Sequence, residues 1–172
     1  VDLTTVVMGP YAGRILGDLG AEVLKVEKPF DERTQLGGDS TRRLGAARNP
    51  GMGSYFLTLN RNKKSIALDL KRPEGLAVAR KLIDSADVLL SNVRPKAMRR
   101  LGLSYEALSA SNSRLIFVSL VGFGQNGPYA ARPAYDDLMQ SATGIGALAA
   151  EAAGDGIPRY APFNAADRTV AL

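Results

Sequence analysis

The sequence alternates between short apolar runs typical of buried strands and segments whose apolar residues recur at helical spacing. Val88–Leu90 and Arg114–Leu120 are strand-like runs, and the segment after Pro73 places Leu76 and Ile83 on one broad helical face. Parallel strands need crossover connections, and helices that serve as crossovers cover both faces of the sheet. The pattern therefore predicts an α/β fold with a mostly parallel sheet and helices on both faces.

A β-α-β unit opens the chain. We expect a strand over Asp2–Met8 that ends before Gly9-Pro10, a helix over Tyr11–Leu19 and a second strand over Glu22–Val26. Glycines 13 and 17 fall inside the helix, where they suit close packing. A dinucleotide fingerprint has its glycines in the first turn, so the match to such a site is poor and we disfavour nicotinamide or flavin binding.

The middle of the chain combines a long polar stretch with several short elements. Phe30–Ser54 is rich in Arg and Gly and lacks periodicity, which predicts a long loop. Tyr55–Leu59 and Ser65–Leu70 read as short strands around a basic turn. Beyond them we expect a short helix that carries Lys96, Arg99 and Arg100, another that begins at Ser104 in the manner of an N-cap, and a helical pattern near Tyr135.

Composition narrows the chemistry that this chain can perform. Its 172 residues include no cysteine and no histidine, so they offer no disulfide, no thiol or imidazole group and no metal site built from those ligands. Nucleophilic or acid–base chemistry must then come from carboxylates, Lys, Tyr, Ser or the backbone. A chain of this length ordinarily forms one domain. Its net charge of +5 suggests an anionic partner.

Several classes of partner are disfavoured. No apolar run approaches the roughly 20 residues of a membrane span, and no secretory leader is visible, so we expect a cytoplasmic protein. Aromatic residues make up only 6% of the chain and no basic stripe interleaves with them, which argues against nucleic acid. The chain starts at Val1 and stops at Leu172 within an apparent helix. We therefore expect it to be truncated at both ends.

The least ordinary stretch is Val121–Gln140, VGFGQNGPYAARPAYDDLMQ. Strand-like residues lead into a loop with three glycines and with Pro128 and Pro133, after which a helical pattern restarts. Glycine lets backbone N–H groups approach a ligand closely, and proline restricts the loop before anything binds. The loop is a candidate ligand site, and an ordinary connection between a strand and a helix is the alternative interpretation.

This loop resembles the signature of the class III CoA-transferases, the CaiB/BaiF family that includes formyl-CoA transferase-like proteins. The resemblance rests on GFGQNGPY, RPAYDDLMQ and NAADRT, together with MGPYAGRILGDLGAEVLKVEKP, LNRNKKSIALDLKRPEG and ADVLLSNVRPKAMRRLGL. It covers nearly the whole chain. It implies that residues 1–172 are a Rossmann-like CoA-binding domain, the N-terminal portion of a longer enzyme that forms an interlocked homodimer.

The resemblance also implies a CoA site, with CoA or acyl-CoA as substrate and no tightly bound cofactor. Lys28 and Arg100 would contact the phosphates, Leu68 and Leu101 would flank the adenine, and other residues would line the remainder of the site. The full set of implied binding residues is Val6, Met8, Lys28, Leu68, Asn92, Val93, Arg100, Leu101 and Tyr135. In open parallel sheets ligands gather beyond the carboxyl ends of the strands, which is where most of these positions fall.

Asp167 matches the catalytic aspartate of the family, and the resemblance implies that it attacks an acyl-CoA thioester. Aspartyl anhydride and aspartyl-CoA intermediates would then carry CoA from one carboxylic acid to another without histidine or metal. Tyr135 and Gln125 are the other candidate catalytic residues, and loop amides near Gln125 are candidate oxyanion donors. A helix N-cap is the alternative interpretation of Asp167.

Two other functions stay open. Relatives that racemise α-methylacyl-CoA carry a histidine at the position of Tyr135, and a phenol is a poor substitute for imidazole in proton exchange. The second alternative is a fragment that binds CoA without catalysing a reaction.

Overall fold

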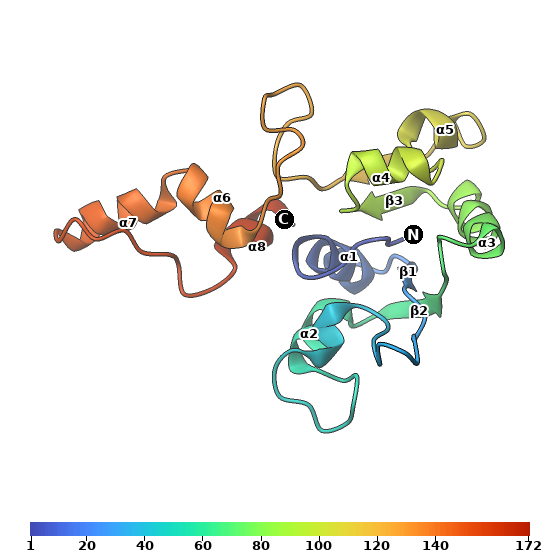
Figure 1. Ribbon diagram of the computed structural model, residues 1–172, viewed down its shortest axis with the longest axis horizontal. Helices are drawn as coiled ribbons and strands as arrows, with labels where there is room; N and C mark the ends of the chain where they lie inside the picture. Colours follow the sequence, from blue (N-terminus) through green and yellow to red (C-terminus); the bar gives the residue numbers. More distant parts are fainter. The chain divides into compact units, whose positions relative to one another are not determined.

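The computed structural model describes all residues from 1 to 172. The chain divides into two compact units, Val1–Leu120 and Val121–Leu172 (Figure 1). The first unit holds every strand and the helices α1 to α5, and the second holds α6 to α8. No helix in either unit has both the length and the apolar character needed to cross a bilayer.

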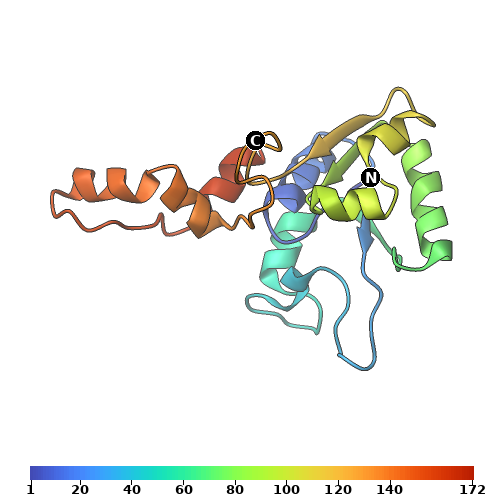
Figure 2. The ribbon, with the colours of Figure 1, turned by 45° about the horizontal axis from the view of Figure 1, so that its top comes forward.

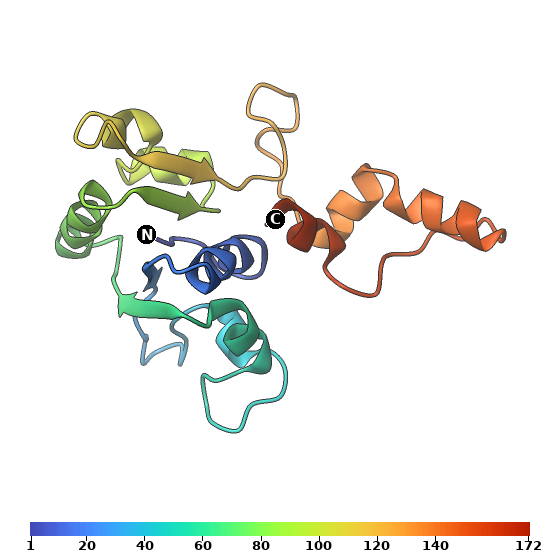
Figure 3. The same ribbon diagram turned by 180° about the vertical axis from the view of Figure 1, so that it is seen from behind.

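The first unit is built on a parallel sheet. Its strands are β1 (Val23–Glu27), β2 (Lys63–Ala67), β3 (Val88–Ser91) and β4 (Ile116–Ser119). β1 pairs with β2, and β3 pairs with β4; Figure 3 shows the latter two side by side with their arrowheads in the same direction. Asp2 bridges both β1 and β3 in parallel, which gives the order β2, β1, amino-terminal segment, β3, β4. The predicted α/β class with parallel strands is confirmed.

One face of the sheet is apolar. It is covered by α3 (Pro73–Asp84), α4 (Pro95–Arg100) and α5 (Tyr105–Ser109). Alternation along the strands turns Leu3, Val26 and Leu89 to this side, where they meet Ile83 of α3 and Met98 of α4. Pro73 is the first residue of α3, as the sequence predicts. This layer is the hydrophobic core of the first unit.

The opposite face is covered by α1 (Met8–Asp18), which packs on β1 and β3, while α2 (Ser54–Asn60) packs on α1. Close approach depends on Gly13, because a Cβ there would lie 3.0 Å from the Asp2 carboxylate and 3.2 Å from Lys63 Nζ. A Cβ on Gly17 would likewise lie 3.2 Å from the Asn62 carbonyl. The interpretation of these glycines as packing residues is confirmed.

Ion pairs fill the space beneath α1. Lys63 Nζ lies 2.9 Å from the Asp2 carboxylate, and Lys25 Nζ lies 3.1 Å from that of Asp39. All four side chains are at most 2% exposed. Lys63 also donates to the Pro10 carbonyl at 2.8 Å. Because buried charges are costly unless paired and hydrogen-bonded, these contacts tie the strands to the covering layer in one arrangement.

Two local predictions were wrong. Tyr55–Leu59 was expected to be a strand but lies in α2, because Phe56 and Leu59 turn to the buried side at a spacing of three residues. Asp2–Met8 was expected to be a strand up to Gly9-Pro10, but α1 begins at Met8. Pro10 fits the first helical turn since the N–H groups there have no intrahelical partner.

The predicted long loop over residues 30–54 is confirmed in outline, and it contains a short 3₁₀ helix, η1 (Ser40–Arg43). Glu27, at the end of β1, anchors this loop. Its carboxylate accepts hydrogen bonds from the Asp39 N–H at 2.8 Å, from Arg42 Nη2 at 2.6 Å and from Ser65 Oγ at 2.6 Å. The loop is therefore fixed against the carboxyl end of the sheet.

The second unit consists of a loop followed by α6 (Asp136–Ala142), α7 (Ile145–Ala153) and α8 (Ala165–Val170). Figure 2 shows the chain running along α6 and α7 and returning beside them to α8. Ser141 Oγ lies 3.1 Å from Tyr160 Oη, and the Arg159 N–H donates to the Gly146 carbonyl at 3.3 Å. These bonds hold the return segment against the two helices.

Candidate active site

Asp167 is the third residue of α8 and is half-buried. Its backbone N–H donates a hydrogen bond of 2.8 Å to Oδ1 of Asp136, which opens α6. The N-cap of α8 is Asn164, so the interpretation of Asp167 as an N-cap is wrong. The two carboxylate residues thus lie at the starts of two helices that pack together.

Gln140 completes this arrangement. Its Nε2 donates to Asp136 Oδ2 at 2.5 Å, and its Oε1 accepts from the Ala161 N–H at 2.8 Å. Both oxygens of Asp136 are therefore occupied, one by Gln140 and one by the backbone of Asp167. The result is a chain of hydrogen bonds that runs from α6 to the segment that carries Asp167.

The electrostatic setting of Asp167 suits a nucleophile. Burial raises the pKa of the Asp167 carboxyl above its usual value, and the negative charge of Asp136 raises it further. A carboxylate with a raised pKa is more basic than a solvated one and has lost part of its hydration shell. Both changes favour attack on a carbonyl carbon.

The other two candidate catalytic residues also lie in the second unit. Tyr135 is the N-cap of α6 and is 65% exposed, so its phenol is open to solvent directly before Asp136. Gln125 is exposed in the loop, where its Nε2 donates to the Phe123 carbonyl at 3.0 Å. Asp167 and Tyr135 thus flank Asp136, whereas Gln125 is engaged within its own loop.

The loop before α6 closes tightly on itself. A Cβ on Gly122 would overlap the Cβ of Ala134, so only glycine allows the two ends of the loop to meet. Inside the loop, the rings of Phe123 and Tyr129 form an edge contact at 5.5 Å, and the Arg132 guanidinium lies 4.5 Å from the Tyr129 ring centre. The loop backbone therefore has internal support in the absence of a ligand.

All predicted CoA-binding residues except Tyr135 lie in the first unit, and Lys28, Leu68 and Asn92 each directly follow a strand. Lys28 follows β1 and is exposed, and Leu68 follows β2 and is half-buried. The Leu68 N–H donates to the Glu27 carbonyl at 2.9 Å, which brings the two strand ends together. Lys28 and Leu68 therefore lie near each other, beyond the carboxyl ends of β1 and β2, where parallel sheets commonly bind ligands.

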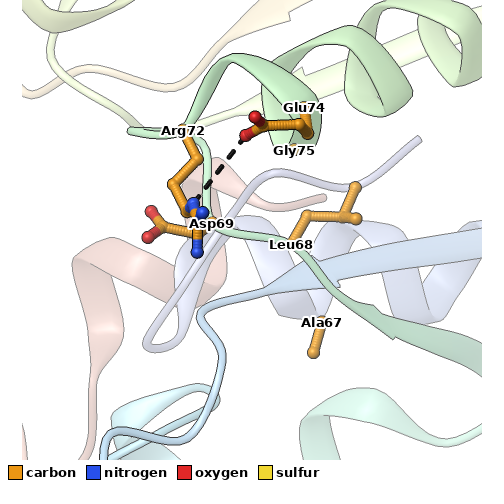
Figure 4. Close-up of a pocket in the computed structure, with 6 residues that line it drawn as sticks. All are labelled: Ala67, Leu68, Asp69, Arg72, Glu74 and Gly75. Carbon is orange, nitrogen blue, oxygen red and sulfur yellow. Dashed lines mark ion pairs between the residues drawn. The ribbon is translucent and has the colours of Figure 1, made fainter.

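Leu68 also lines an open pocket of about 370 Å³ (Figure 4). The other lining residues are Ala67, Asp69, Arg72, Glu74 and Gly75. Arg72 Nε lies 3.7 Å from Glu74 Oε2 across the start of α3. The pocket thus combines the apolar side chain of Leu68 with one cation and two carboxylates.

Asn92, at the end of β3, holds the turn that precedes α1. Its Oδ1 accepts from the Thr5 N–H at 3.0 Å and its Nδ2 donates to the Thr5 carbonyl at 2.8 Å. Val6, which follows Thr5, has a φ of 73°, a left-handed conformation that is rare for a β-branched residue. The Val6 N–H points to the Asp39 carboxylate, with an N–O distance of 3.3 Å to Oδ2.

This turn is strained and held from two sides, a combination that clusters at ligand sites. Val6 is 45% exposed, and Met8 begins α1 directly beyond it. Asn92 spends one donor and one acceptor on Thr5, so one amide hydrogen and one oxygen lone pair are left for a ligand. Val93 donates its N–H to Ser91 Oγ at 3.2 Å and packs against the core.

The remaining predicted binding residues lie at the end of α4. Arg100 is the last residue of that helix and is exposed, which leaves its guanidinium available to an anion. Leu101 is half-buried and packs against the same core cluster as Leu68. The predicted binding residues other than Tyr135 belong to the first unit, whereas Tyr135, Gln125 and Asp167 belong to the second.

Sequence reasoning missed Asp136, Gln140 and Asp39. Only the structure marks Gln140, which is 1% exposed while Leu138 on the same helix is 46% exposed. Glutamine on the inward side and leucine on the outward side is the reverse of a simple core helix. The sequence does not mark Asp39 either, because its partners Val6 and Lys25 lie far away in the chain.

Comparison with known proteins shows the family of the chain. Residues 1–172 match the family described as CoA-transferase family III. The chain is 40% identical over 173 residues to the succinate–glutarate CoA-transferase of Agrobacterium fabrum, covering 97% of this chain and 41% of that protein. It is 45% identical over 148 residues to the acetyl-CoA:oxalate CoA-transferase of Acetobacter aceti, covering 84% and 36% respectively.

Among solved structures, a CaiB/BaiF family protein from Brucella suis superimposes with a TM-score of 0.86 at 38% identity, covering 96% of this chain and 42% of that one. The chain belongs to CoA-transferase family III, and its fold is that of the CaiB/BaiF proteins. The predicted family is thereby confirmed. The chain spans about two fifths of the length of the curated relatives it matches.

Proposed function

We propose that the protein containing this chain is an acyl-CoA:carboxylate CoA-transferase in which Asp167 is the nucleophile. The observation that carries the proposal is the half-buried Asp167 carboxyl, whose backbone is held by Asp136 and whose pKa is raised by burial and by the Asp136 charge. Membership of CoA-transferase family III supports the same assignment.

In the first half-reaction, a carboxylate oxygen of Asp167 attacks the thioester carbonyl of the donor acyl-CoA. The C–S bond breaks, CoA leaves as a thiolate, and an acyl–aspartyl anhydride remains. The thiolate then attacks the aspartyl carbonyl of this anhydride. The donor acid leaves as a carboxylate, and CoA is bound to Asp167 as a thioester.

The second half-reaction runs in reverse with the acceptor. The acceptor carboxylate attacks the aspartyl thioester, expels CoA thiolate and forms a new anhydride. The thiolate attacks the acceptor's carbonyl carbon in that anhydride, which releases the new acyl-CoA and restores the Asp167 carboxylate. Each tetrahedral intermediate needs hydrogen-bond donors for its oxyanion, and the amides of residues 122–127 and the Gln125 side chain are the candidates.

The first unit would bind CoA at the carboxyl ends of its strands. Lys28 and Arg100 are exposed cations for the phosphates, and Leu68 and Leu101 supply apolar walls for the adenine. The resemblance assigns Asn92 and Tyr135 to the pantetheine and the thioester end, and Val6, Met8 and Val93 are further predicted binding residues. CoA acts here as a substrate, and no resident cofactor is required.

The substrates are small carboxylic acids and their CoA thioesters. The named relatives act on succinate and glutarate or on acetyl-CoA and oxalate, which makes short mono- and dicarboxylates the first acids to test. We propose that the full-length protein is a homodimer, as the family resemblance implies, and that it acts in the cytoplasm, as the sequence analysis predicts. Sedimentation of the full-length protein and fractionation of its host cells test these two points.

The test is covalent trapping in the protein expressed at its full natural length. Incubation with succinyl-CoA and hydroxylamine should convert Asp167 to a hydroxamate, located by mass spectrometry of its peptide. Asp167→Ala should form none while binding CoA with wild-type affinity, and Asp137→Ala on the exposed side of α6 should behave as wild type. A wild-type hydroxamate at another residue would contradict the proposal.

The same samples separate the alternatives. If no adduct forms and the α-proton of a branched acyl-CoA exchanges with deuterated water, the protein is a racemase. If CoA binds and neither reaction occurs, the protein binds CoA without transferring it.

A further inference from the structure

Gln140 is a buried amide at the centre of the second unit. It is 1% exposed, and it contacts α6 and the return segment through both of its polar atoms. Its Nε2 reaches Asp136 Oδ2 at 2.5 Å and the Phe163 carbonyl at 3.5 Å, and its Oε1 accepts from the Ala161 N–H at 2.8 Å. Buried polar groups are retained where every bond is satisfied, and this one is.

The position of Gln140 links two parts of the proposed site. Through Asp136 it reaches the backbone N–H of Asp167, and through residues 161 and 163 it holds the segment that leads into α8. Asp167 thus receives its position from Gln140 by two routes. None of the transfer steps uses Gln140 as a donor or base, so its contribution lies in placement.

We propose that Gln140 is a positioning residue that holds the Asp136 carboxylate and the 161–167 segment in the arrangement that CoA transfer requires. This inference rests on the proposed function of Asp167. The chemistry demands an amide, because one end must donate to a carboxylate and the other must accept from a backbone N–H. An ionised glutamate can accept hydrogen bonds but cannot donate one. An apolar side chain can neither donate nor accept.

The surrounding charges make the test specific. The ionisable side chains on the packed elements are Tyr135, Asp136 and Asp137 on α6, Glu151 on α7, Asp155, Arg159 and Tyr160 on the return segment, and Asp167 and Arg168 on α8. Arg159 pairs with Asp155, and Asp136 is the group that contacts the Gln140 amide. A glutamate at position 140 would therefore add a negative charge directly against Asp136.

The experiment measures the rate of Asp167 adduct formation against pH at saturating succinyl-CoA in the full-length protein. Gln140→Glu should lower the rate by about 10²-fold, because a misplaced nucleophile loses its near-attack geometry. It should also move the acidic limb of the profile to higher pH, since the added charge opposes ionisation of Asp167. Gln140→Met should lower the rate at every pH without that upward movement.

A charge-neutral swap provides the rescue. In Asp136→Asn/Gln140→Glu, the asparagine amide donates to the new carboxylate while its oxygen still accepts from the Asp167 N–H. The swap should recover at least about tenfold of the rate lost in Gln140→Glu, and a purely steric role for Gln140 would give no such recovery. Gln35→Glu in the 30–54 loop is the matched control and should leave the profile unchanged.

CoA affinity and thermal melting identify any variant that fails to fold. The inference about Gln140 is then judged on the variants that do fold. The inference is overturned if folded Gln140→Glu and Gln140→Met keep the wild-type rate and profile within twofold, or if the folded swap recovers nothing. A wild-type protein without an Asp167 adduct would overturn the proposed function itself, and the inference with it. Loss of rate in the Gln140 variants beside a normal wild-type adduct supports both.

Discussion

The backbone N–H of Asp167 donates a hydrogen bond to the Asp136 carboxylate at 2.8 Å, across 31 positions of sequence. The bond leaves the Asp167 side chain uncommitted while it fixes the start of α8 against the start of α6. Asp136 therefore acts on Asp167 in two ways, through its hydrogen bond and through its charge. These two effects can be separated by substitution.

Asp136→Asn removes the charge and keeps an acceptor for the Asp167 N–H, while its Nδ2 replaces the oxygen that accepts from Gln140, so that bond is lost. Because the charge of Asp136 raises the pKa of Asp167, its loss should lower that pKa and extend adduct formation to more acidic pH. The rate on the alkaline plateau should fall, since a less basic carboxylate is a weaker nucleophile. Stopped-flow measurement of CoA release against pH checks both changes.

Asp137→Asn is the control for this pair, because Asp137 is exposed and its carboxylate accepts a hydrogen bond from the neighbouring Leu138 N–H at 2.9 Å. Its profile should match wild type. An equal movement of the acidic limb in both variants would show that general charge, and not the Asp136 contact, acts on Asp167.

The anchor at Glu27 should make stability depend on acid. Burial acts to raise the pKa of Glu27, but hydrogen bonds from Arg42, Ser65 and the Asp39 N–H outweigh it and lower the pKa from 4.5 to about 2. A depressed pKa contributes stability that is complete above pH 4.5 and is lost as the pH falls through about 2. Urea midpoints measured through this window should fall in wild type.

Glu27→Gln should flatten that fall and cost about 2 kcal/mol at neutral pH, because it weakens the charge-assisted bonds from Arg42. Glu22→Gln is the matched control. Glu22 is an exposed glutamate whose pair with Lys64 lies in solvent, so its loss should change the free energy of unfolding far less than Glu27→Gln does. A steep acid dependence that survives in Glu27→Gln would contradict this account.

Val6→Gly should stabilise the protein by about 1 kcal/mol, because relief of the left-handed strain exceeds the entropy that glycine loses on folding. Val78→Gly is the comparison. Val78 is similarly exposed, at 40% against 45%, but lies in α3, where glycine should cost about 1 kcal/mol. Urea unfolding of the two variants checks the sign, and destabilisation by Val6→Gly would refute the strain.

Gly122→Ala should force the ends of the 121–135 loop apart, because the new methyl group overlaps Ala134. Overpacking of this kind costs about 1–3 kcal/mol. Gly124→Ala should be nearly neutral in stability, since no atom lies within 4 Å of the added Cβ. Thermal melts and limited proteolysis of the loop compare the two variants.

Periodicity in the sequence was enough to predict the sheet and the helices that cross over between its strands. Val88–Leu90, Arg114–Leu120 and the helix after Pro73 all lie close to their observed positions. Periodicity failed at Tyr55–Leu59, whose aromatic and threonine residues favour a strand locally. The segment is helical because Phe56 and Leu59 pack against the rest of the unit. Those packing partners lie outside the five residues on which the prediction was based.

The candidate site, like the fold, could be predicted from the sequence only in part. Motif resemblance selected Asp167, Tyr135 and the residues after the strands as candidates, and their roles stay predictions. It could not identify Asp39, Asp136 or Gln140 as partners, because each acts through hydrogen bonds to residues at least four positions away and often far beyond. The left-handed turn at Val6 was equally hidden, since valine gives no local sign of that conformation.

The buried lysines beneath α1 have a chemical consequence for a protein that handles reactive thioesters. Acyl-CoA can acylate an accessible, neutral lysine amine without any enzyme. The Lys63 amine is only 2% exposed, and it donates to Asp2, to the Pro10 carbonyl and to Asn60, which occupies all three of its hydrogens. Lys25 is similarly enclosed, whereas the solvent-facing lysines are 28, 64, 71, 81 and 96. Side reactions with substrate should therefore accumulate on those five surface amines, as peptide mapping after long incubation would show, and spare the two on which the sheet depends.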